Sequence, residues 1–156
     1  MKQYTKFNNI SGWAVFAIAA WVFLSTIEMT GSFWDCGEFI AAAYKLQIGH
    51  PPGAPLFLML SRIMTLFAGG NEASIPIMVN AFSAIMSAFA VLFTFWTITA
   101  IARKVVFTKN QEPTFSQILT VIASGVVGAL AFTFTDSFWF SAVEGEVYAT
   151  SQFFTC

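Results

Sequence analysis

Charged side chains are scarce in this 156-residue chain: Asp, Glu, Lys and Arg make up 10% of it, and there is one histidine. Soluble domains carry roughly 25% charged residues, so this composition disfavours a soluble fold. The net charge of −1 gives no basis for nucleic-acid binding, which relies on clustered positive charge. Two cysteines, Cys36 and Cys156, are too few for a disulfide or metal framework.

The few charges are unevenly distributed, and three long windows contain none: 7–27, 73–102 and 113–135. Each window can supply the roughly 20 helical residues that cross a hydrocarbon core of about 30 Å. A small soluble domain has no use for three such windows, because each of its helices needs a polar face. We therefore predict an all-α, multi-pass membrane protein with transmembrane helices at about 11–30, 76–102 and 117–135.

The segment 31–75, between the first two predicted spans, has a different composition. We expect a first helix at about 35–48 and a second at about 56–68, separated by a proline-rich turn. The second is too short to span the membrane and contains Arg62, so both are predicted to lie at the membrane surface. The last stretch, 136–156, is predicted to be a second outer segment or the start of the next helix.

Basic residues predict the orientation, because cytoplasmic loops are enriched in Lys and Arg. Lys2 and Lys6 put the N-terminus in the cytoplasm, and Arg103, Lys104 and Lys109 put the loop after the second span there too. Two crossings separate these basic sites, which agrees with an interfacial second helix in the preceding loop. That loop and the C-terminal stretch are then predicted to face away from the cytoplasm.

Four residues of the first outer loop are candidates for chemistry. Asp35, Glu38 and Lys45 would share one face of a helix. Apolar surroundings would partly desolvate the two acids, which raises a carboxyl pKa or demands a cationic partner. His50 opens a rigid His-Pro-Pro-Gly-Ala-Pro turn and can both donate and accept hydrogen bonds. The alternatives are a solvated polar face and a plain connector.

Two further acids and one arginine complete the candidates. Glu144 and Glu146 would lie on the same outer face as Asp35 if the predicted topology holds. They are otherwise ordinary loop residues. Arg62 either extends its side chain to water from an interfacial helix or meets an anionic group such as a phosphate.

Two long motifs carry a family resemblance. Residues 34–43 (WDCGEFIAAA), followed by 47–57 (QIGHPPGAPLF), resemble the membrane protein family catalogued as domain of unknown function 2723, and 141–148 (SAVEGEVY) resembles that family's second motif. The family is similar to protein O-mannosyltransferases and to the GT-C class of glycosyltransferases. The resemblance covers essentially the whole chain but only the N-terminal part of the family's usual length, so we expect a fragment that is inactive alone.

The resemblance implies a GT-C-like N-terminal module that transfers a sugar from a polyprenyl-phosphate-linked donor. The acceptor would be a hydroxyl of an exported protein, a glycan or a lipid. The active site would face the periplasm from a bacterial inner membrane. Asp35 and Glu38 would be catalytic, with Asp35 as the general base. The substrate-binding candidates are Lys45, His50, Arg62 and Glu144.

Nothing in the sequence demands a metal ligand set or a cofactor, although two carboxylates would also suit a divalent cation. Two other functions remain compatible with the same residues. In a multi-pass transporter the acids and His50 would couple to an ion or substrate. In a non-catalytic membrane scaffold neither acid would matter.

Overall fold

A computed structural model describes residues 1–51, 53–108 and 111–155, so Pro52, Lys109 and Cys156 lie outside the described residues. The described residues are helical, without strands, which confirms the predicted fold class. The helices are α1 (Lys2–Ser25), α2 (Cys36–Lys45), α3 (Pro55–Thr65), α4 (Ile75–Val106), α5 (Phe115–Thr133), α6 (Asp136–Val143) and α7 (Val147–Thr155), with 3₁₀ turns at Leu66–Ala68 and Glu72–Ser74.

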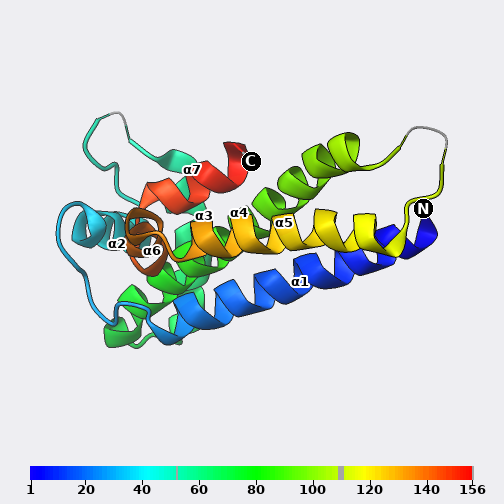
Figure 1. Ribbon diagram of the computed structural model, residues 1–156. Helices are drawn as coiled ribbons and strands as arrows, with labels where there is room; N and C mark the ends of the chain where they lie inside the picture. The colour runs from blue at the N-terminus through cyan, green and yellow to red at the C-terminus, as the bar shows by residue number, and fades with distance from the viewer. Residues whose placement is uncertain (52, 109–110, 156) are drawn as a thin grey trace.

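Three helices, α1, α4 and α5, are long and apolar enough to cross a membrane. They run alongside one another (Figure 1), with the N-terminus and the α4–α5 connection at one end and α2 and α6 at the other. Their shared core contains Phe23 of α1, Ala88 and Phe95 of α4, and Ala129 of α5. We call α2, α3 and α6, with the loops 26–35 and 144–146, the cap.

Glycines at 125 and 128 let α5 approach α4 closely. A Cβ added at Gly125 would collide with the Thr99 side chain and lie 2.9 Å from Phe95 Cε2. A Cβ at Gly128 would lie 2.6 Å from Ile98 Cδ1. The bundle is therefore fixed by backbone proximity and apolar packing.

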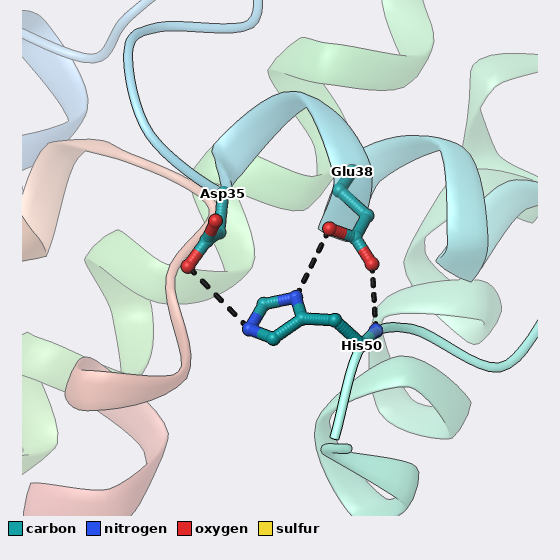
Figure 2. A group of neighbouring side chains, drawn as sticks. All are labelled: Asp35, Glu38 and His50. Atoms are coloured by element: carbon teal, nitrogen blue, oxygen red, sulfur yellow. Dashed lines mark hydrogen bonds and ion pairs between the residues drawn. The ribbon is translucent and has the colours of Figure 1, made fainter. Parts of the chain in front are cut away.

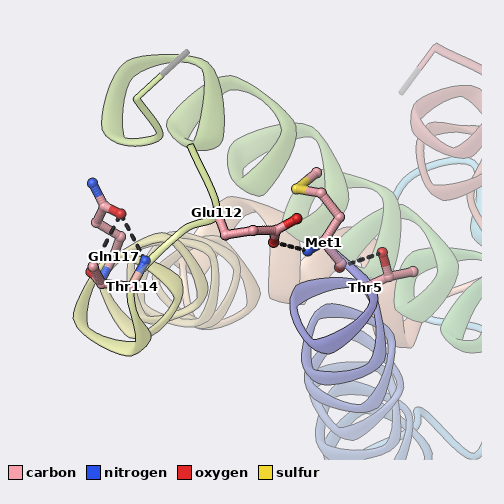
Figure 3. A network of polar contacts seen from close by, with 5 residues as sticks. All are labelled: Met1, Thr5, Glu112, Thr114 and Gln117. Carbon is pink, nitrogen blue, oxygen red and sulfur yellow. Dashed lines mark hydrogen bonds and ion pairs between the residues drawn. The ribbon is translucent and has the colours of Figure 1, made fainter. Parts of the chain in front are cut away.

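The N-terminal end of the bundle is closed by polar contacts (Figure 3). The ammonium group of Met1 pairs with Glu112, in the connection between α4 and α5. Thr114 and Gln117 form a capping box at the start of α5, in which each side chain bonds the other residue's backbone N–H. The Met1–Glu112 contact holds the start of α1 beside the connection that follows the basic last turn of α4.

Helix α1 differs from the predicted span 11–30, because it begins at Lys2 and ends at Ser25. Polar residues extend it at the start, where the ring of Tyr4 is buried and packs edge-on against Phe107. At the other end the Thr26 hydroxyl donates to the Val22 carbonyl at 2.9 Å and closes the last turn. The chain then leaves as the extended loop that leads to the cap.

One of the two predicted cap helices is shorter than predicted, and the other has its predicted extent. Helix α2 covers less than 35–48, because Leu46 takes a left-handed conformation with φ of 51° and stops it. The predicted helix 56–68 is α3 continued by a 3₁₀ turn. The stretch 136–156 divides into α6 and α7, and Gly145 stands at the bend between them.

Candidate functional site

Asp35, Glu38 and His50 meet at the cap (Figure 2). The His50 ring lies between the two carboxylates, with Nδ1 at 3.0 Å from Glu38 Oε2 and Nε2 at 3.7 Å from Asp35 Oδ2. The backbone N–H of His50 donates to Glu38 Oε1 at 2.7 Å. Both oxygens of Glu38 are thus engaged with His50, whereas Asp35 is held by one longer contact.

Local structure explains how these three residues meet. Asp35 is the N-cap residue of α2 and Glu38 lies in its first turn, where a negative charge is favoured by the helix dipole. The left-handed Leu46 turns the chain back, so His50 returns to the start of the same helix. A side chain at Gly49 would bring its Cβ to 3.2 Å from Glu38 Oε1, which explains the small residue there.

Charge complementarity shifts the pKa values of this pair in opposite directions. Hydrogen bonds from the backbone and ring of His50 hold the pKa of Glu38 below its usual value of 4.5. The hydrogen bond to Glu38, with the charges of Glu38 and Asp35, raises the pKa of His50 above 6.5. Both shifts favour the charged forms of the pair, with His50 as a cation beside carboxylates.

Two acids from the distant α6–α7 bend join the site. Glu144 and Glu146 are buried, with side chains 5% and 7% exposed. Glu146 shares a cavity of about 400 Å³ with Asp35 and His50. Burial, reinforced by the charges of Asp35 and Glu144, raises the pKa of Glu146 to about 7. Both acids are candidates from the sequence, although only Glu144 is predicted there to bind substrate.

A buried asparagine positions the α6–α7 bend against the loop before α2. Asn80 of α4 donates from Nδ2 to the backbone carbonyls of Glu28 at 2.7 Å and Thr30 at 3.1 Å. The Glu28 N–H in turn donates to the Val143 carbonyl at 3.1 Å. Gly145 lies directly over Asn80, where an added Cβ would be 2.9 Å from Oδ1. The Asn80 side chain therefore positions both backbone segments that carry the acids, the loop before α2 and the α6–α7 bend.

The two predicted phosphate-binding cations are placed elsewhere. Arg62 donates from Nη1 to the Tyr44 carbonyl at 2.7 Å and to Thr65 Oγ1 at 3.2 Å, and its guanidinium lies over the Tyr44 ring. It thus fastens α3 to the end of α2, a structural role that neither predicted interpretation included. Lys45 is exposed in the last turn of α2.

Asp35, Glu38 and His50 each offer one ligand atom, and these atoms lie within 4.8 Å of one another. Two carboxylates and an imidazole suit several divalent cations. In the present arrangement, however, the imidazole bridges the carboxylates by hydrogen bonding and charge. Proton transfer and hydrogen bonding are therefore the chemistry that this geometry supports directly.

The fold and the site together define a multi-pass integral membrane protein with an acidic centre at one end of its helix bundle. The family described as "Protein O-mannosyl-transferase TMEM260 N-terminal domain" matches residues 35–156. The chain belongs to this family, which confirms the predicted resemblance to protein O-mannosyltransferases. The match begins at Asp35 and includes every candidate site residue.

Two curated relatives have the same description. Protein O-mannosyl-transferase TMEM260 of Mus musculus is 30% identical over 142 residues, which is 90% of this chain and 17% of the relative. Protein O-mannosyl-transferase tmem260 of Dictyostelium discoideum is 26% identical over 120 residues, 77% of this chain and 13% of the relative. The chain thus spans less than a fifth of the length of either. No solved structure matches it. Both organisms are eukaryotes, so the bacterial membrane stays a prediction.

Proposed function

We propose that this chain supplies the acidic centre of a membrane-bound glycosyltransferase. The enzyme moves a sugar from a polyprenyl-phosphate-linked donor to a hydroxyl of an exported protein or a glycan. The observation that carries the proposal is the convergence of Asp35, Glu38, His50 and Glu146 at one end of the bundle. The O-mannosyltransferase names of the relatives supply the reaction class. In proteins as long as these relatives, residues outside the matched region also contribute to the activity.

In the proposed reaction the acceptor hydroxyl oxygen attacks the anomeric carbon of the donor sugar. The bond from that carbon to the phosphate oxygen breaks, and its electron pair leaves with the phosphate. Asp35 takes the hydroxyl proton, since it is the carboxylate of the His50 trio with the least local hydrogen bonding. General-base assistance of this type contributes roughly 10²–10⁴ in rate.

Glu38 is proposed to act through His50. Its two contacts fix the imidazole and favour its cationic form beside Asp35. A cation there provides positive charge for a phosphate leaving group. Because Arg62 is occupied in joining α2 to α3, His50 is the described basic residue best placed for that task.

An apolar cavity beside the centre suits a lipid-linked donor. It has a volume of about 390 Å³, is lined by Ile48, Leu58 and Met59 among others, and shares Gly53 and Ala54 with the cavity that contains Asp35 and His50. The polar head group of such a donor would lie at the acids, and its prenyl chain would lie along this apolar groove.

The bundle geometry favours a non-cytoplasmic centre. Arg103 and Lys104, in the last turn of α4, lie at the end that also holds the N-terminus, and α2 lies at the opposite end (Figure 1). If the basic end faces the cytoplasm, as membrane proteins generally arrange it, the acids face the exterior or a lumen. A periplasmic site in a bacterium would be one case of this.

The test is Asp35→Asn in the natural protein, assayed for sugar transfer in isolated membranes. We expect a loss of at least a hundredfold with unchanged protein level, because the amide cannot accept the proton. Asp136→Asn, which changes an exposed acid at the start of α6, is the matched control and should retain activity. Transfer that survives Asp35→Asn would refute the assigned mechanism.

A further inference from the structure

A further cavity shares Asp35, Glu146 and Tyr148 with the cavity that contains His50, and its lining is distinctive. Its volume is about 310 Å³, and three of its lining residues are aromatic: Trp34, Phe140 and Tyr148. This size is at the lower end of the ~300–1,000 Å³ typical of small-molecule sites. It fits a compact ligand such as one sugar ring.

The polar part of the lining consists of acids and a hydroxyl. Asp35, Glu144, Glu146 and Ser141 complete the cavity, and none of the described lining residues is Lys or Arg. Glu144 and Glu146 are more than nine-tenths buried and form no ion pair among the described residues. Buried carboxylates need hydrogen-bond donors, so the lining calls for a ligand rich in them.

The charge of the cavity selects among ligands. The acidic lining disfavours a phosphate, whereas a neutral polyol supplies several O–H donors and no negative charge. The aromatic rings add apolar faces against which the C–H face of a sugar ring can pack. Acids and aromatic rings together therefore favour a neutral hexose over an anion.

Trp34 shows unusual backbone geometry in this lining. Its φ is 62°, in the left-handed region that non-glycine residues rarely occupy, and its side chain is 90% exposed. Such a conformation is strained and tends to persist at ligand-binding positions. Here it presents an exposed indole beside Asp35, at the mouth of the cavity.

We propose that the cavity between Trp34, Tyr148 and the buried Glu144–Glu146 turn binds the neutral hexosyl group of the donor, with the phosphate outside. The inference rests on the proposed function and adds the sugar subsite to it. Carboxylates of Glu144 and Glu146 accept hydrogen bonds from ring hydroxyls, and Trp34 covers one face of the ring. The anomeric carbon then lies at the Asp35 edge, where the acceptor oxygen attacks.

The test measures binding of methyl α-mannopyranoside to the purified chain by saturation-transfer NMR, in a detergent without a sugar head group. We expect saturable binding that inorganic phosphate does not displace. Glu144→Gln should weaken it about tenfold or more, because a charged hydrogen-bond acceptor is lost. Trp34→Ala should weaken it about tenfold, because the aromatic face against the sugar ring is lost. Trp34→Phe, which keeps an aromatic face, should retain most of the binding.

Trp21→Ala is the matched control, because Trp21 is an exposed indole on α1 outside the cavity lining. Near-UV circular dichroism of each variant checks that the fold is retained. Absence of saturable binding in the unchanged chain would overturn the sugar subsite. So would equal weakening by Trp21→Ala and Trp34→Ala. If the hexoside binds as expected but transfer does not depend on Asp35, the proposed mechanism fails and the subsite stands.

Discussion

The transmembrane bundle and the cap are held together by different forces. In the bundle, α4 and α5 meet through apolar side chains and the glycines at 125 and 128. In the cap, the Asn80 amide, the Glu28 N–H and the Arg62 guanidinium reach backbone carbonyls of other segments. The bundle should therefore respond to changes of volume, and the cap to the loss of single hydrogen bonds.

The largest effect should come from overfilling the bundle. Gly125→Leu puts a branched side chain where Thr99 and Phe95 already lie, so α4 and α5 must separate. Overpacking costs ~1–3 kcal/mol, and more where the backbone blocks relaxation. We expect a lower thermal midpoint of helix loss in detergent, measured by circular dichroism, and loss of the site with it.

Val127→Leu provides the control on the same helix. Val127 is 68% exposed and faces away from the core, so a larger side chain has room there. An equal fall in the thermal midpoint for both variants would show that close α4–α5 contact is not what stabilises the bundle.

A smaller, localised effect is expected from Asn80→Leu. The change keeps the branched shape of the side chain but leaves the Glu28 and Thr30 carbonyls without their donor, and a typical hydrogen bond contributes ~0.5–1.5 kcal/mol. Hydrogen–deuterium exchange should accelerate in 26–35 and 143–146 and stay slow along α5. Total helix content should be unchanged.

Ser83→Ala is the matched control for Asn80→Leu. Ser83 lies three residues further along α4, and its buried hydroxyl has no hydrogen-bond partner among the described residues. It should leave exchange in the cap as it was. Faster exchange spread evenly over α4 and α5 in Asn80→Leu would mean that the cap and the bundle are one cooperative unit.

The same contrast explains what the sequence could predict. The spans are local features, because a charge-free window of sufficient length forms a membrane helix whatever its neighbours are. The meeting of Glu146 with Asp35 depends on residues far apart in the chain and on the buried Asn80, whose partners are backbone groups. The structural role of Arg62 could not be predicted for a similar reason. Its partner is a backbone carbonyl, and a backbone carbonyl is present at every residue.

The ends of α1 and α2 were also beyond prediction. Polar residues at 2–10 are helical because Tyr4 finds a buried position against Phe107. Helix α2 stops at Leu46, a residue with no turn preference, because the chain must return His50 to Glu38. In both cases tertiary contacts outweigh local propensity.

The smallest effect should come from breaking the Glu38–His50 pair, which lies at the exposed surface of the cap. His50 is the chain's one histidine, so its ring signals can be followed by NMR without assignment. In the unchanged chain we expect a pKa above 6.5. Glu38→Gln should bring it down toward 6.5, with the charge of Asp35 retaining part of the rise. Glu72→Gln, which removes an acid outside the trio, should leave it unchanged.

The sign of the pH dependence follows from both partners. The raised pKa of His50 gives stability that is fully present below 6.5 and is lost as the pH rises through the folded-state value. The lowered pKa of Glu38 gives stability present above 4.5 and lost as the pH falls through its folded-state value. The pair is therefore strongest between about pH 4.5 and 6.5. If Glu38→Gln leaves the pKa of His50 unchanged, the two side chains do not interact in solution. There would then be no reason to place a cation beside Asp35.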